Sequence, residues 1–89
     1  MADYKILVSK RAEHGLDRIR DNNTLKRIVR KIDELARDPR PSGVRKIVGS
    51  DIDYRIRMGH YRIIYQINDA QKVVEIRGIG HRKQIYKKL

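Results

Sequence analysis

The spacing of apolar residues changes near Pro39, and this change restricts the fold more than any other feature. Between Ala12 and Pro39, apolar residues recur every three or four positions, which is the repeat of an amphipathic helix. After it, apolar and polar residues alternate, which is the repeat of a β-strand with one buried face. Helices early and strands late predict an α+β domain. The helical set is Leu25, Ile28, Val29, Ile32, Leu35 and Ala36.

Local signals predict the individual elements. A strand is expected over 4–8, after which Ser9 can cap a first helix with Ala12, Leu16 and Ile19 on one face. The second helix should end at Asp38, because a residue that precedes proline is driven out of the helical region. The predicted order is β-α-α-β-β-β, with an antiparallel sheet of about four strands and both helices packed on one face. Strand-like alternation covers 44–48, 54–58, 61–67 and 72–79, with a loop over 38–43 and a turn over 68–71.

The length and the charge limit what the chain can be. A chain of 89 residues suits one domain, 1–89, and is too short for two. Its formal net charge of +11 should attract phosphate polymers or acidic proteins, with nucleic acid as the first expectation. The excess positive charge is concentrated in the second part of the chain. Residues 1–53 carry 13 Lys and Arg against 9 Asp and Glu, whereas residues 54–89 carry 9 Lys and Arg against 2 Asp and Glu.

Several chemistries lack the residues they need. The chain has no cysteine, which excludes disulfides, thiolate catalysis and cysteine-ligated zinc. Its 3 histidines are scattered and form no ligand set with carboxylates, so we expect neither a metal nor a cofactor. No apolar run approaches the roughly 18 to 20 residues that span a bilayer. A cytoplasmic protein without membrane contact is therefore expected.

One hairpin gathers the late arginines. Gly59 and His60 can form a two-residue turn of type II′, which would pair Arg57 with Arg62 and place Arg55 on the same face. Like charges directly opposite each other are unfavourable unless an anion shares the site, so the register predicts an anion site. If the turn over 68–71 sets the next register, Arg77 also lies opposite Arg62, with Glu75 on the same face as a candidate partner for Arg77. The opposite face would hold the apolar pairs Met58–Tyr61, Ile56–Ile63 and Tyr54–Tyr65.

A structural interpretation of these arginines stays open. Long cationic side chains often cover an exposed sheet face with their aliphatic stems and bind nothing. The cations of the helices, which alternate with acids, fit that description better, because i,i+4 pairing solvates a helix face. On the hairpin, phosphate binding is favoured because the planar guanidinium fork matches phosphate oxygens. The spacing does not distinguish DNA from RNA.

The sequence resembles the RelE branch of the RelE/ParE toxins over nearly its whole length. The resemblance is carried by YRIRMGHYRIIYQI over 54–67 and by GIGHRKQIYKKL over 78–89, with PRPSGVRKIVG over 39–49 similar to the loop and strand that precede the first arginine strand there. It implies a ribosome-dependent endoribonuclease that cleaves mRNA in the ribosomal A site and is neutralised by a cognate antitoxin. It also implies functional roles for Arg55, Arg57, Arg62, Arg82 and Tyr86. Some members have lysine at the first two of these positions, which leaves the general base open.

The chemistry implied by the resemblance can be assigned to residue types. RNA is cleaved without a metal when its 2′-hydroxyl attacks the neighbouring phosphate in line, helped by proton transfer and by cations that stabilise the phosphorane. Arginine suits only the last task, since its pKa above ~12 makes it a poor base. We therefore assign the hairpin arginines and Arg82 to the phosphate, and proton transfer to His81 and Tyr86, while His60 and His14 are expected to be solvated or structural. Further RNA contacts are expected from Arg45, Lys46, Arg77, Lys83, Lys87 and Lys88.

The expected partners are the ribosome with its 16S rRNA, mRNA and the antitoxin. The free toxin is expected to be a monomer and to form a hetero-oligomer with the antitoxin. Two other functions stay open from the residues. A protein of the ParE branch would inhibit DNA gyrase, and a non-catalytic module would bind RNA or the ribosome through phosphate contacts alone.

Overall fold

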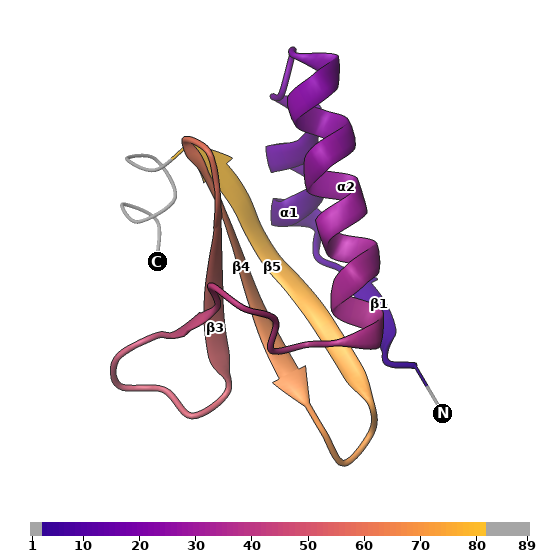
Figure 1. The fold of residues 1–89 in the computed structure, drawn as a ribbon, viewed down its shortest axis with the longest axis vertical. Helices are drawn as coiled ribbons and strands as arrows, with labels where there is room; N and C mark the ends of the chain where they lie inside the picture. The colour runs from indigo at the N-terminus through magenta and orange to yellow at the C-terminus, as the bar shows by residue number, and fades with distance from the viewer. Residues whose placement is uncertain (1–2, 82–89) are drawn as a thin grey trace.

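A sheet of five strands carries two helices on one of its faces (Figure 1). The computed structural model describes residues 3–81. The predicted fold class, α+β with both helices on the same side of the sheet, is confirmed. In chain order the elements are β1 (Lys5–Val8), α1 (Lys10–Asp17), α2 (Asn22–Arg37), β2 (Arg45–Lys46), β3 (Asp53–Met58), β4 (Tyr61–Asn68) and β5 (Val73–His81).

Both helices begin at a capping side chain, but α1 ends at Asp17, so Ile19, which was expected on its apolar face, lies just beyond the helix. Ser9 caps α1, because its Oγ accepts a hydrogen bond from the backbone N of Ala12 at 3.1 Å. Asp21 caps α2 by accepting from the backbone N of Asn23 at 3.2 Å and from the hydroxyl of Thr24 at 2.6 Å. The second helix stops at Arg37, and Asp38 before Pro39 is extended, as predicted.

The sheet is mixed, which corrects the antiparallel sheet of about four strands expected from the sequence. Its strand order is β1-β5-β4-β3-β2, and β1 runs parallel to β5 while every other neighbouring pair is antiparallel. Two parallel strands must be joined by a long crossover connection. Here that connection contains both helices and the strands β2, β3 and β4, which lie between β1 and β5 in the sequence. The strand expected over 44–48 is also shorter, because β2 comprises only Arg45 and Lys46.

The hairpin register around Gly59 is confirmed. Gly59 has a φ of 63°, and His60 is not among the residues with positive φ, which is the pattern of a type II′ turn. The structure pairs Arg57 with Arg62 and places Tyr54, Ile56 and Ile63 in the core. The complete set of pairs is Met58–Tyr61, Arg57–Arg62, Ile56–Ile63, Arg55–Ile64, Tyr54–Tyr65 and Asp53–Gln66.

The next register differs from the prediction. The turn occupies 69–72, one residue later than expected, and a bulge interrupts the β4–β5 pairing between Ile64 and Tyr65. Arg62 therefore lies opposite Gly80, and the prediction that Arg77 faces Arg62 is wrong. An extra residue in one strand shifts every later pair, and apolar alternation alone does not reveal it.

The core lies between the helices and the inner face of the sheet. Tyr65, Ile28, Leu35, Ile63, Ile76 and Val74 are its largest fully buried side chains. Burial of Tyr65 raises the pKa of its phenol, whose hydroxyl donates to the carbonyl of Pro39 at 2.8 Å. Val29, which the helical repeat placed on the apolar face, is instead 43% exposed. Within residues 3–81, neither helix has the length and apolar character needed to cross a membrane.

Candidate nucleic-acid interface

Four arginines from three adjacent strands surround one depression on the sheet. It has a volume of about 140 Å³, and the described residues that line it are Gly43, Arg45, Arg55, Arg57 and Arg62. We call this set the cationic pocket. Two strand pairings form it, because Arg45 of β2 lies opposite Arg55 of β3, and Arg57 of β3 lies opposite Arg62 of β4. Residues that face each other across antiparallel strands point to the same side, so the guanidinium groups converge.

The arginines of the cationic pocket are partly ordered by the protein itself. The Nε of Arg57 donates to the carbonyl of Gly59 at 3.0 Å, which ties this side chain to the hairpin turn. Arg55 and Arg62 are half-buried, and Nη1 of Arg62 is buried completely. Because no carboxylate is among the described lining residues, the local charge is strongly positive. Such a site suits an anion that accepts several hydrogen bonds at once, as phosphate does.

Other predicted residues lie outside the cationic pocket. Arg77 is on β5 and forms an ion pair with Glu75, with 3.2 Å between Nη1 and Oε1. This confirms the expected Glu75 partner, although not the expected position of Arg77. Lys46 lies opposite Tyr54 on the strand, so it points to the other side from Arg45. Arg82, Lys83, Tyr86, Lys87 and Lys88 lie outside the described residues.

His81 lies with two other rings at the tip of the sheet. Its ring stacks on His60 with centroids 6.1 Å apart, and it meets Tyr61 edge-on at 5.9 Å. His81 is the strand partner of Tyr61, whose side chain packs on the core side, whereas Arg62 points to the opposite face. The structure therefore groups His81 with His60 and does not place it among the lining residues of the cationic pocket. His14, in the last turn of α1, is exposed.

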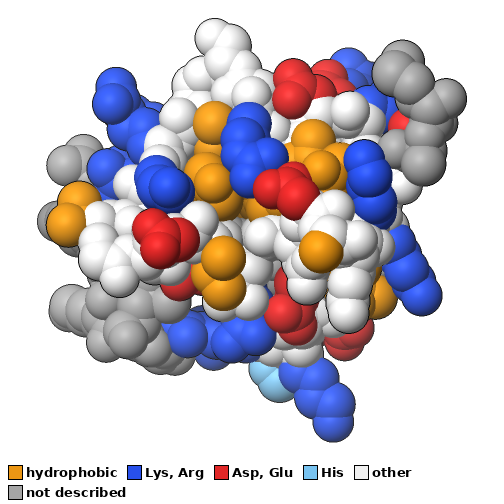
Figure 2. Space-filling view, turned by 90° about the horizontal axis from the view of Figure 1, so that it is seen from below, with side chains coloured by type: hydrophobic (Ala, Val, Ile, Leu, Met, Phe, Trp, Pro, Cys, Tyr) orange, Lys and Arg blue, Asp and Glu red, His pale blue; other side chains and the backbone are white. Residues whose placement is uncertain are grey.

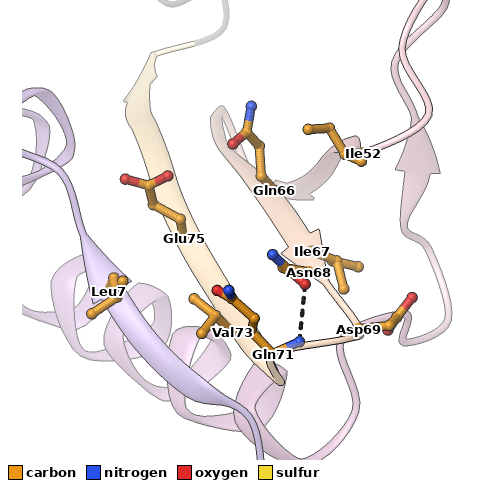
Figure 3. A pocket seen from close by; sticks show the side chains of 9 residues that line it. All are labelled: Leu7, Ile52, Gln66, Ile67, Asn68, Asp69, Gln71, Val73 and Glu75. Carbon is orange, nitrogen blue, oxygen red and sulfur yellow. Dashed lines mark hydrogen bonds between the residues drawn. The ribbon is translucent and has the colours of Figure 1, made fainter.

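A larger groove lies on the sheet beside the β4–β5 turn (Figure 3). It has a volume of about 560 Å³, and its described lining contains carboxylates and carboxamides but no lysine or arginine. The side-chain oxygen of Asn68 accepts from the backbone N of Gln71 at 3.0 Å, which closes the turn at one end. Size alone would favour this groove, but its charge is wrong for a phosphate polymer. The lining residues are Leu7, Ile52, Gln66, Ile67, Asn68, Asp69, Gln71, Val73 and Glu75.

On one face of the molecule, charged side chains of both signs are mixed. Figure 2, which looks at the molecule from below Figure 1, shows lysine and arginine side chains spread over this face with acids and hydrophobic side chains among them. On this face, positive charge alone does not mark out a binding site. The strand register does, because it brings together arginines that are up to 17 positions apart, Arg45 and Arg62.

The sequence interpretation missed two parts of this region. Gly43 lines the cationic pocket with a φ of 91°, a conformation that favours glycine, and the predicted loop over 38–43 is the only signal that pointed to it. It also missed the ion pair of Arg40 and Asp69. Hydrogen bonds from Arg40 and then Tyr4 lower the pKa of the Asp69 carboxyl to about 2. Within residues 3–81, histidines and carboxylates form no group of three that could hold a metal ion.

A family model agrees with this geometry. The model described as the ParE toxin of type II toxin–antitoxin systems matches residues 6–86. The chain belongs to this family. The chain is also similar to a toxin assigned as RelE1 and to RelE chains of solved RelE–RelB complexes, so the resemblance to the RelE/ParE toxins is confirmed.

Three similar proteins from archaea, one curated and two with solved structures, illustrate the likeness. A protein of Methanocaldococcus jannaschii assigned as toxin RelE1 is 29% identical over 87 residues, which cover 94% of this chain and 96% of that protein. The archaeal RelE–RelB complex of Pyrococcus horikoshii contains a chain with a TM-score of 0.80 and 28% identity, covering 92% of this chain and 98% of that one. The RelB–RelE antitoxin–toxin complex of Methanococcus jannaschii contains a chain with a TM-score of 0.77 and 29% identity, covering 93% of this chain and 98% of that one.

Proposed function

We propose that this ParE-family protein is a ribosome-dependent endoribonuclease toxin that cleaves mRNA in the ribosomal A site. The observation that carries the proposal is the convergence of Arg45, Arg55, Arg57 and Arg62 in one pocket. Backbone phosphates of RNA are the anions that such a pocket fits, and a cluster of fixed positive charges stabilises the extra negative charge of a phosphorane. The resemblance of the hairpin and tail to the RelE branch supports RNA rather than DNA as the target.

The residues divide between phosphate stabilisation and proton transfer. Arg55, Arg57 and Arg62 hold the scissile phosphate while the 2′-hydroxyl attacks it in line, and Arg82 adds a further cation. Proton transfer falls to His81 and Tyr86, because arginine stays protonated at neutral pH. Since His81 lies at the tip beyond Arg62, it serves this role only for RNA that extends past the Gly59 turn. Arg77, Lys83, Lys87 and Lys88 bind flanking phosphates, whereas Lys46 points to the other side of the sheet and is left out of this set. Neither metal nor cofactor takes part.

A cognate antitoxin is the second partner that we propose. The relatives from P. horikoshii and M. jannaschii were solved as complexes of RelE with RelB. The net charge of +11 favours a partner segment that is acidic, since opposite charges speed association and limit wrong partners. The free toxin is a cytoplasmic monomer, and larger assemblies form through the antitoxin.

Mapping mRNA ends tests the proposed activity. Purified protein is added to ribosomes that hold a defined mRNA codon in the A site, and the 5′ and 3′ ends are sequenced, with free mRNA in parallel. We expect cuts within the A-site codon only when ribosomes are present, and a loss of cleavage in Arg62→Gln. Arg11→Gln, an exposed substitution on α1, is the matched control and should cleave normally. Intact mRNA with the unmodified protein would refute the proposal.

Inhibition of DNA gyrase is the second candidate, because the matching family model is named for ParE. A supercoiling assay with the same protein samples separates the two functions. Blocked supercoiling with intact mRNA would support this candidate. If both assays are negative, a module that only binds RNA or the ribosome becomes the better description. The cationic pocket favours the nuclease, because phosphate contacts are central to its chemistry.

A further inference from the structure

The cationic pocket depends on a strand that is poorly anchored by its own pairing. Strand β2 has only two residues, both exposed, and it pairs with β3 through Arg45–Arg55 and Lys46–Tyr54. The first of these pairs sets two arginines side by side, which is unfavourable at close range. A two-residue strand contributes few hydrogen bonds to offset that repulsion. Other contacts must therefore hold Arg45 at the pocket.

One anchor lies directly after β2. The hydroxyl of Ser50 donates to the carboxylate of Asp53 at 2.7 Å and accepts from the backbone N of Asp53 at 3.1 Å. The backbone N of Ile47 donates to the carbonyl of Asp53 at 2.8 Å. These contacts close the loop between β2 and β3, but they do not reach the entry to β2. That entry is the connection 38–44, which crosses from the helix layer to the far edge of the sheet (Figure 1).

The entry is held by an ion pair between this connection and the β4–β5 turn. Nη1 and Nη2 of Arg40 donate to Oδ1 and Oδ2 of Asp69 at 3.2 and 2.9 Å, a two-pronged contact that fixes orientation as well as distance. The Tyr4 hydroxyl donates to the same Oδ1 at 2.6 Å. We call these three residues the Asp69 clamp. Asp69 lies on the turn itself (Figure 3).

The Asp69 clamp is also attached to the core. The Nε of Arg40 donates to the hydroxyl of Tyr54 at 3.3 Å, and its guanidinium carbon lies 5.2 Å from the centroid of the Tyr54 ring. Tyr54 stacks on the buried Tyr65, whose hydroxyl donates to the carbonyl of Pro39 at 2.8 Å. Arg40 is thus fixed on three sides. Gly43, which lines the cationic pocket, follows only three residues later.

We propose that Asp69, through its pair with Arg40, is a positioning residue that holds Arg45 in the cationic pocket. Asp69 does not touch the bound phosphate. It fixes the connection 38–44, and this fixes the start of β2 against the repulsion between Arg45 and Arg55. The inference rests on the proposed binding of RNA at the pocket, but it does not require that the RNA be cleaved.

A double-mutant cycle between Asp69 and Arg45 tests this inference. Affinity for a single-stranded 2′-O-methyl RNA, which cannot be cleaved, is measured for Asp69→Asn, Arg45→Gln and the double variant. We expect each single variant to weaken binding about tenfold, and the double variant to be no weaker than either, because coupled residues are not additive. Asp69→Glu, which keeps the charge, should restore most of the affinity. Glu34→Gln breaks a comparable exposed pair with Lys31 on α2 and should bind normally.

Two outcomes would overturn the inference. Additive losses would mean that Asp69 and Arg45 act separately, and unchanged binding in Asp69→Asn would mean that the clamp does not position the pocket. If Asp69→Asn fails to fold, Arg40→Lys replaces it in the cycle, since it keeps the charge and loses the two-pronged contact. If the unmodified protein does not cleave mRNA, the proposed nuclease activity is refuted. The double-mutant cycle remains interpretable, because it measures RNA affinity and not cleavage.

Discussion

Asp69 shows how one exposed carboxylate can organise residues that are far apart in the chain. It joins Tyr4 and Arg40, which are 65 and 29 positions away, to the β4–β5 turn. Hydrogen bonds from Arg40 and then Tyr4 lower the pKa of Asp69 to about 2. The hydrogen bond from Tyr4 to Asp69 also raises the pKa of the Tyr4 phenol. The pair with Asp69 also raises the pKa of Arg40, which stays charged under all ordinary conditions.

Titration of the Asp69 carboxyl tests this description. In the folded protein its pKa should be about 2, and Arg40→Met should raise it toward the usual value of about 3.9. Because the folded pKa is the lower one, the pair stabilises the protein at neutral pH, and this contribution is lost as the pH falls from about 4 to about 2. The measurement is the ¹³C shift of the carboxyl against pH. An equal pKa in the two proteins would show that Arg40 is not the cause.

At the residue scale, the sequence predicted contacts that are local and missed those that are not. Gly59 fixes a two-residue turn, and that turn fixes which residues of β3 and β4 face each other, so the pairing of Arg57 with Arg62 could be derived. The contact of Arg40 with Asp69 joins a loop to a turn. Neither has a periodic pattern, and hence no spacing rule connects the two residues.

At the element scale, the position of α1 against β5 depends on a glycine. Gly15 is buried in α1, and a Cβ at this position would overlap the carbonyl oxygen of Ile79. Glycine normally weakens a helix relative to alanine by up to about 1 kcal/mol. The close approach of helix and strand explains why the residue is tolerated here. β5 is also the strand that carries His81 at its end.

Gly15→Ala should therefore destabilise the protein despite its better helix propensity. We expect a loss of about 2 kcal/mol in the free energy of unfolding, because overpacking against backbone outweighs the propensity gain. Gly43→Ala, where a Cβ meets nothing within 4 Å, serves as a comparison that involves backbone strain without overlap. Urea denaturation followed by circular dichroism measures both. A stabilised Gly15→Ala protein would contradict the packing of α1 on β5.

Most elements and the β3–β4 pairing were predictable from the sequence, but the partner of β1 and the β4–β5 register were not. The cap at Ser9 and the helix end before Pro39 each depend on a single residue, so these two helix boundaries could be predicted. The parallel pairing of β1 with β5 joins strands 68 positions apart, as in Lys5–Val73. Alternation identifies a strand but not its neighbour. The later turn and the bulge near Ile64 together place Gly80, not Arg77, opposite Arg62.

At the scale of the whole molecule, the excess positive charge acts in two ways. It attracts any polyanion from a distance, and it makes a neutralising acidic partner favourable. Among the described residues, we propose that the cationic pocket turns this general attraction into a defined site, because its four arginines come from three strands held in register. The predicted anion site on the hairpin thus has a structural counterpart, to which β2 adds Arg45.

The salt dependence of RNA binding tests the cationic pocket most directly. Affinity for a single-stranded 2′-O-methyl RNA is measured by fluorescence anisotropy over a range of salt concentrations. Each phosphate contact contributes about 0.7 to the slope of log affinity against log salt, so Arg55→Gln with Arg62→Gln should reduce the slope by about 1.4. Arg11→Gln combined with Arg20→Gln, both exposed and outside the pocket, should leave it nearly unchanged. Equal reductions in the two double variants would show that RNA responds only to net charge, and would contradict a defined site.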